Sequence, residues 1–178
     1  KFKGVLKSEG ETSATFRMML KAWKAIEGLS DAEQFLQDYQ TANKGSTHIW
    51  YAFGYLNYLK TDYGKAEKNF EEALKMNPEN GLAWNNLGAI FSEKKEYVLA
   101  IEKVKRAIQT DPKESMFFLN LQKIYQEMGE PDRFKNEYRN LQQKNSKLLA
   151  WGYGKTLARV IRQRAFGSYS KGDLDNAI

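Results

Sequence analysis

The middle of the sequence repeats with a period of 34 residues. Identical residues recur at this spacing in one phase: Trp50 and Trp84, Gly54 and Gly88, Ala66 and Ala100, Ala73 and Ala107, and Pro78 and Pro112. A fixed period of this length is typical of stacked repeat arrays. It restricts the chain to an architecture in which each copy is a small unit that buries its apolar face against the next copy.

Within one copy, apolar and small residues follow helical spacing twice. A first helical face is predicted by residues at i, i+3, i+4 and i+7, namely Trp50, Phe53, Gly54 and Asn57. A second face is predicted by Ala66, Phe70, Ala73 and Leu74. The stretches 61–64 and 77–80 interrupt the two faces with turn-forming residues. Each copy is therefore expected to be an antiparallel helix pair, with the small residues at the closest approach of its helices.

The period divides the chain into three copies, which we place at residues 47–80, 81–114 and 115–148. The third copy is looser, because Gln122 and Phe134 stand where the first two have Gly and Ala. Its helices are expected to pack at a different angle or spacing. Residues 1–46 are expected to form a helical segment, either a degenerate repeat or a cap. Residues 149–178 are expected to form a basic amphipathic helix and the start of a further partial repeat, so that the chain is a fragment of a longer array or ends in a frayed cap.

These residues resemble the tetratricopeptide repeat family, whose pattern is W-x2-L-G-x2-Y, then A-x3-F, A and P. The first and second copies match it at the recurring Trp, Gly, Ala and Pro positions given above. The resemblance implies an all-α, right-handed solenoid of antiparallel helix pairs. It also implies that the first helix of each pair lines a concave groove that binds ligands.

Composition excludes much of enzyme chemistry. The 178 residues include no Cys and one His, which excludes disulfides, thiolate metal sites, a Cys nucleophile and a multi-histidine metal centre. The scattered Asp and Glu residues nominate no acid/base pair, so we expect neither catalysis nor a cofactor. No apolar run approaches the ~20 residues of a membrane-spanning helix, and the first residues lack the apolar stretch of a signal peptide. We favour the cytoplasm, although the absence of Cys is equally compatible with an exported compartment.

The family resemblance implies a peptide-binding groove that includes His48, Tyr51, Tyr55, Tyr58, Asn85, Asn86, Asn120 and Lys123. The three tyrosines lie at i, i+4 and i+7, which suits either aromatic recognition of a ligand or packing against the preceding helix pair. The two amides that are 34 residues apart, Asn86 and Asn120, suit bonding to the backbone of an extended peptide. The basic clamp with which some family members hold a C-terminal carboxylate is not matched, because Tyr51 and Met116 stand at two of its lysine positions.

The net charge is +6, and residues 149–178 carry five basic and two acidic side chains. Lys155, Arg159 and Arg162 lie at i, i+4 and i+7 and predict a basic stripe, which either docks an acidic partner or is simply solvated.

We expect a non-catalytic scaffold or adaptor that binds a segment of a partner protein, with self-association through the repeat ends left open. The alternatives are a nucleic-acid-binding helical repeat acting through the basic C-terminal end, which the charge-neutral central repeats disfavour, and a regulatory domain of a larger enzyme.

Overall fold

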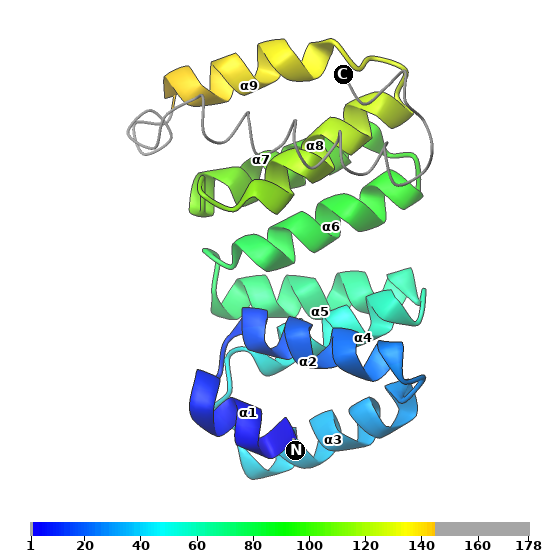
Figure 1. Ribbon diagram of the computed structural model, residues 1–178, viewed down its shortest axis with the longest axis vertical. Helices are drawn as coiled ribbons and strands as arrows, with labels where there is room; N and C mark the ends of the chain where they lie inside the picture. The colour runs from blue at the N-terminus through cyan, green and yellow to red at the C-terminus, as the bar shows by residue number, and fades with distance from the viewer. Residues whose placement is uncertain (1, 145–178) are drawn as a thin grey trace.

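The computed structural model describes residues 2–144, and within this range every regular element is an α-helix. The helices are α1 (Phe2–Glu9), α2 (Ser13–Ala25), α3 (Leu29–Ala42), α4 (Ile49–Leu59), α5 (Tyr63–Met76), α6 (Gly81–Glu93), α7 (Tyr97–Thr110), α8 (Ser115–Glu127) and α9 (Arg133–Lys144). Figure 1 shows them stacked along the long axis of the molecule, from α3 at one end to α9 at the other. The expected fold class, an all-α solenoid of helix pairs, is confirmed. The predicted segment 149–178, with Lys155, Arg159 and Arg162, lies outside the described residues.

Close packing within a pair depends on the recurring small residues. A Cβ atom added to Gly54 would lie 2.6 Å from Cδ1 of Phe70, and one added to Gly88 would lie 2.5 Å from Cγ2 of Val104. Both distances are far inside van der Waals contact, so any side chain at these two positions would push α4 from α5 and α6 from α7. The repeated glycine is therefore a packing requirement of the first two copies.

The turn inside each helix pair contains one residue in the left-handed region, and it recurs every 34 residues. The φ angles are 58° at Glu27, 61° at Thr61, 62° at Lys95 and 78° at Gly129. Because this region is costly for residues other than glycine, the shared conformation reflects a shared turn geometry. The pairs α2–α3 and α8–α9, whose sequences fit the repeat poorly, thus use the same turn as the two clear copies.

Ion pairs repeat with the same period at one junction between neighbouring pairs. Glu33 of α3 pairs with Lys60 at the end of α4, and Glu67 of α5 pairs with Lys94 at the end of α6. Both members of the second pair lie 34 residues after their counterparts in the first. The pair α2–α3 therefore stacks on α4–α5 in the register that α4–α5 adopts on α6–α7.

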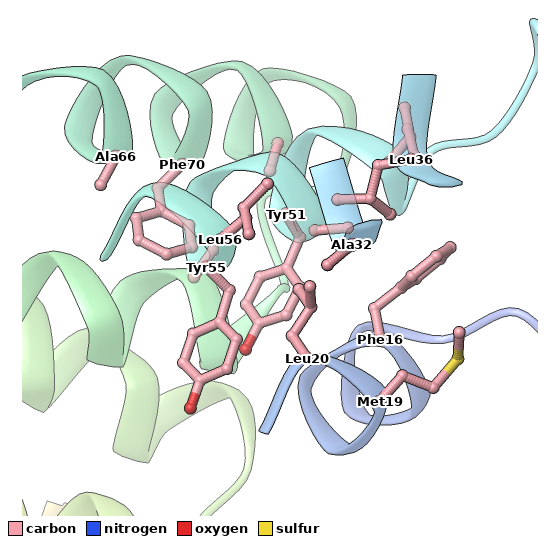
Figure 2. Packing of buried hydrophobic residues seen from close by; sticks show 14 of the residues in the cluster. Phe16, Met19, Leu20, Ala32, Leu36, Tyr51, Tyr55, Leu56, Ala66 and Phe70 are labelled. Atoms are coloured by element: carbon pink, nitrogen blue, oxygen red, sulfur yellow. The ribbon is translucent and has the colours of Figure 1, made fainter. Parts of the chain in front are cut away.

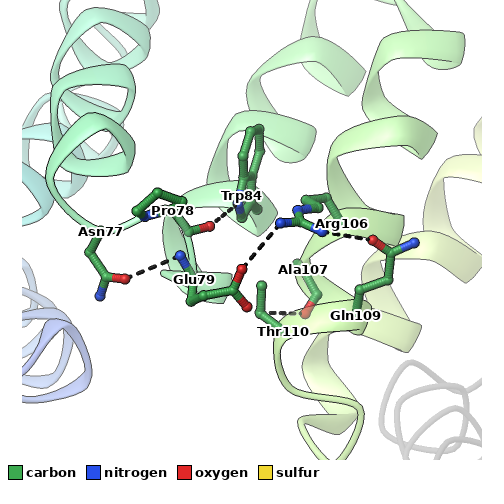
Figure 3. Close-up of polar contacts among 8 residues, drawn as sticks. All are labelled: Asn77, Pro78, Glu79, Trp84, Arg106, Ala107, Gln109 and Thr110. Carbon is green, nitrogen blue, oxygen red and sulfur yellow. Dashed lines mark hydrogen bonds and ion pairs between the residues drawn. The ribbon is translucent and has the colours of Figure 1, made fainter. Parts of the chain in front are cut away.

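The joint between α5 and α6 is fixed by a set of polar contacts that Figure 3 shows. The Trp84 indole Nε1 donates to the Pro78 carbonyl at 2.8 Å, and the Arg106 guanidinium of α7 pairs with Glu79 at 3.1 Å. The half-buried Trp84 ring packs against both clusters of buried apolar side chains, one centred on α2–α6 and the other on α7–α9. This residue thus joins the two halves of the core.

The pair α8–α9, which is the third copy, differs from the first two copies in its packing residues, as its sequence indicates. Phe134 of α9 occupies the place of a small alanine, is buried, and has its ring centroid 6.1 Å from that of Tyr138. Tyr138 in turn packs on Phe118 of α8 at 5.2 Å. Aromatic rings therefore fill the space between α8 and α9, whereas glycine and alanine let the two helices approach closely in the first two copies. No helix among residues 2–144 combines the length and apolar character needed to cross a bilayer.

Candidate functional site

The first helices of four successive pairs share one hollow, which we call the groove. It has a volume of about 170 Å³, and its lining comes from α2, α4, α6 and α8, namely Arg17, Lys21, Tyr55, Tyr58, Asn85, Asn86, Ala89, Ser92, Glu93, Met116, Asn120, Lys123 and Ile124. Ligand pockets for drug-sized molecules and cofactors are commonly about 300–1,000 Å³. The groove therefore has room for a side chain and nearby backbone of a peptide rather than for a cofactor.

Most of the residues predicted from the sequence meet in this groove. Tyr55, Tyr58, Asn85, Asn86, Asn120 and Lys123 all contribute to its lining. The rings of Tyr55 and Tyr58 are stacked with their centroids 6.1 Å apart and form an aromatic wall on α4. Burial raises the pKa of both phenols, so both are uncharged hydroxyls at neutral pH.

Tyr51 is a core residue and not a surface for a ligand, which corrects the expectation that it lines the groove. Its side chain has 0% exposure, and its ring packs on Phe70 at 5.6 Å and stacks on Tyr55 at 6.2 Å. Figure 2 shows the ring enclosed between α2, through Leu20, and the residues of α4 and α5. Burial strongly raises the pKa of the Tyr51 phenol, and the nearby Arg17 charge opposes only part of that rise.

His48 also lies away from the groove, which corrects its predicted place. It lines a second hollow of about 330 Å³ at the edge where α2, α4 and α6 begin, which we call the edge hollow. The Ser13 hydroxyl lies 3.1 Å from His48 Nδ1 and accepts a hydrogen bond of 2.8 Å from Asn80 Nδ2. The three side chains tie together the starts of α2, α4 and α6.

Hydrogen bonds between side chains 35 residues apart link the first helices to one another. Asn86 Nδ2 donates to the Tyr51 hydroxyl at 3.1 Å, and Asn120 Nδ2 donates to Asn85 Oδ1 at 2.8 Å. These bonds connect α4 to α6 and α6 to α8 and fix the orientation of both amides. Among residues 2–144, neither Oδ1 atom of Asn86 and Asn120 has a hydrogen-bond partner, so both remain available to accept from a ligand.

A third bond of the same spacing holds the far end of the groove. Ser92 donates to Glu127 at 2.6 Å, and Glu127 also pairs with Lys123 at 3.2 Å. Burial lowers the pKa of Lys123, but its bond to Glu127 and the charge of Glu93 outweigh this, so its pKa is raised. The cation predicted at this position is therefore present but already neutralised by acidic neighbours.

Arg17 and Lys21 line the groove although the sequence did not single them out. They lie one helical turn apart on α2, in the segment where the repeat pattern is weakest. Leu20 stands there in place of the small residue, so the groove-facing positions of α2 could not be assigned by analogy with the clear copies. The i, i+4 spacing of two cations was the available signal. No cluster of metal-ligating side chains occurs within residues 2–144.

Comparison with known proteins agrees with the repeat assignment. Residues 51–115 match the family model described as tetratricopeptide repeat. Among curated proteins, the peroxisomal targeting signal receptor of Saccharomyces cerevisiae is 40% identical over 57 residues, which span 32% of this chain and 9% of the receptor. The match thus covers a short stretch of both proteins and leaves most of the receptor without a counterpart here.

Solved structures resemble the whole array in fold. MamA aligns with a TM-score of 0.57 and 21% identity, covering 82% of this chain and 85% of its own. PilF of Pseudomonas aeruginosa aligns with a TM-score of 0.59 and 18% identity over 93% and 86% of the two chains. YrrB, described as a TPR protein with an unusual peptide-binding site, aligns with a TM-score of 0.54 and 16% identity, covering 99% of this chain and 87% of its own. Residues 51–115 therefore carry the sequence pattern of the tetratricopeptide repeat family, and the described helix pairs share the fold of these solved structures.

Proposed function

We propose that this protein is a non-catalytic adaptor that holds a segment of a partner protein in the groove. The observation that carries the proposal is the pairing of an aromatic wall, Tyr55 and Tyr58, with two amides whose orientation is fixed by the 35-residue hydrogen bonds. Repeat arrays of this kind present extended surfaces that suit protein segments. The peptide-binding site named for YrrB is consistent with this use of the fold.

The chemistry of the groove divides the work between its two sides. Amide oxygens of Asn86 and Asn120 accept from backbone N–H groups, which every peptide offers, and so set the register of a bound segment. The half-buried ring of Tyr58 offers a large apolar face with a polar tip, which suits an anchoring contact. The small side chain of Ala89 on α6 leaves the floor between them open.

The same surface gives no reason to propose catalysis. The serine and histidine that lie together, Ser13 and His48, connect the starts of helices, and Ser13 is buried and held by Asn80. The alternative of nucleic-acid binding rests on Lys155, Arg159 and Arg162, which lie outside the described residues. No observation on residues 2–144 favours it over the peptide groove.

The proposal is tested by filling the groove. A phage-displayed library of random dodecapeptides is selected on the wild-type chain, and the affinities of the enriched peptides are measured by fluorescence anisotropy. In Ala89→Arg a long side chain occupies the groove floor and is expected to weaken binding at least about tenfold. Val98→Arg adds the same charge at an exposed position on α7, away from the groove, and should leave affinity unchanged. Peptides that bind Ala89→Arg as well as wild type would place the binding surface elsewhere.

A further inference from the structure

Arg17 spans the groove from one wall to the other. It lies on α2, and its Nη1 atom is 2.9 Å from the Met116 sulfur on α8, a residue 99 positions further along the chain. A guanidinium carries five N–H donors, whereas a thioether is only a weak acceptor. Within residues 2–144 no carboxylate forms an ion pair with Arg17 or with Lys21, which follows it by one turn. The α2 wall thus presents two cations that form no ion pair with the described residues.

The other groups that line the groove supply no negative charge that pairs with Arg17 or Lys21. Tyr55, Asn86 and Asn120 are neutral acceptors or donors, and Glu93 lies 3.8 Å from Lys123, which Glu127 also neutralises. Positive charge in the groove is therefore concentrated on α2. A negatively charged ligand group that pairs with these cations must reach the Arg17 side of the aromatic wall.

Arg17 also lies where the groove meets the edge hollow, since among the described residues it alone lines both. A segment bound in the groove can continue past the guanidinium into the edge hollow. The group that meets Arg17 therefore belongs to an internal residue of the segment, with chain on both sides of it, and not to its end.

We propose that the groove selects a segment with an acidic side chain, whose carboxylate binds the Arg17 guanidinium in place of the Met116 sulfur, with Lys21 adding its charge. This inference rests on the proposed function and names the chemistry of its ligand. A planar guanidinium matches a carboxylate with two parallel hydrogen bonds, which gives both affinity and orientation. The two cations lie on α2, outside the stretch that carries the sequence pattern of the family.

The edge hollow limits how much negative charge the ligand carries. Asp111 and Glu114 line it, and neither forms an ion pair among the described residues. A run of acidic residues, or the phosphates of a nucleic acid, would meet these carboxylates after passing Arg17. The arrangement therefore favours a single carboxylate flanked by neutral or basic residues.

The test uses synthetic peptide pools of random sequence with one fixed central residue, Glu or Gln, each prepared with an amidated or a free C-terminus. The intact chain should retain the amidated Glu pool about 10- to 100-fold better than the amidated Gln pool, in line with a charge-assisted hydrogen-bond pair. Arg17→Gln should abolish this preference, and Lys21→Gln, at an exposed position, should reduce it. Lys68→Gln makes the same charge change at an exposed position on α5, which does not contribute to the lining of the groove, and should leave the preference intact.

Each other result contradicts a stated part of the proposal. If the Gln pool with a free C-terminus binds as well as the amidated Glu pool, the carboxylate is terminal and the internal assignment is wrong. Binding lost in Ala89→Arg but equal for Glu and Gln pools overturns the acidic preference and leaves the groove as the peptide site. Retention that is insensitive to Ala89→Arg contradicts both proposals. Arg17-dependent binding of a single-stranded oligonucleotide, tighter than that of the Glu pool, would replace the peptide ligand with nucleic acid.

Discussion

At the scale of single residues, two neighbouring tyrosines with the same predicted role serve different ends. Tyr51 and Tyr55 lie one turn apart on α4, yet Tyr51 is enclosed by α2 and bonds Asn86, whereas Tyr55 lines the groove with 5% exposure. The difference depends on where α2 packs. Helical spacing within α4 carries no information about that, so the sequence could predict the stripe but not which ring the neighbouring helix covers.

Removing the Tyr51 hydroxyl tests its role in holding Asn86. Tyr51→Phe keeps the buried ring but leaves the Asn86 Nδ2 group without its partner, and it should lower the free energy of unfolding by about 1–2 kcal/mol. Tyr55→Phe is the matched control, because no described residue accepts from or donates to its hydroxyl. Chemical denaturation of both variants gives the comparison. Equal losses in the two variants would show that the bond to Asn86 contributes nothing specific.

The buried phenols make stability depend on alkaline pH. Burial raises the pKa of Tyr51, Tyr55 and Tyr58, while the same groups in the unfolded chain titrate near pH ~10. The folded state thus keeps these protons when the unfolded state has lost them. The stabilisation that these protonated phenols give the folded state is fully present below about pH 10 and is lost as the pH rises through their folded-state pKa values.

Unfolding free energies measured across the alkaline range check this dependence. They should fall above about pH 10, and tyrosinate absorbance should rise together with unfolding. The decline should be shallower in Tyr51→Phe, which lacks the most deeply buried phenol. A stability that stays flat through this range, or a Tyr51→Phe variant with the same slope as wild type, would contradict the burial of these hydroxyls.

At the scale of helices and turns, the sequence predicted the pairs well where small residues recur. Gly54 against Phe70 and Gly88 against Val104 are the contacts that the 34-residue pattern indicates. The left-handed turn residues escaped prediction, because Glu27, Thr61 and Lys95 are not residues that favour this conformation. Only Gly129 carried a signal for it. The turn geometry is imposed by the packing of the two helices and not by local preference.

Substitution at these turns should therefore have opposite effects at two equivalent positions. Thr61→Asn replaces a β-branched residue by one that tolerates φ near +60°, and it should stabilise the protein by about 0.5–1 kcal/mol. Gly129→Ala introduces a Cβ at φ 78° with no other atom within 4 Å, so its cost of about 1 kcal/mol is that of the backbone alone. Thermal melts of both variants show whether each substitution raises or lowers the melting temperature. Destabilisation by Thr61→Asn would show that the threonine hydroxyl, which bonds the Lys60 carbonyl, outweighs the strain.

At the scale of the whole molecule, stacking brings the first helices of successive pairs together along one groove. Trp84 packs against both core clusters, so the halves of the array keep a fixed relation. The 35-residue hydrogen bonds then align side chains from α4, α6 and α8, and Arg17 closes the surface from α2. The groove thus depends on four helix pairs, of which the sequence identified two clearly. Its α2 wall could not be predicted, because the residues that place it fit the repeat pattern poorly.

The most direct measurement follows side-chain amide resonances by NMR while a groove-selected peptide is titrated into the isotopically labelled chain. The amides of Asn85, Asn86 and Asn120 should shift, because they line the groove and two of them offer Oδ1 to the ligand. Those of Asn136 and Asn140, on α9 and outside the groove, should stay in place. Shifts of the α9 amides without any change at Asn86 and Asn120 would contradict the claim that the first helices of these repeats form the site at which a partner binds.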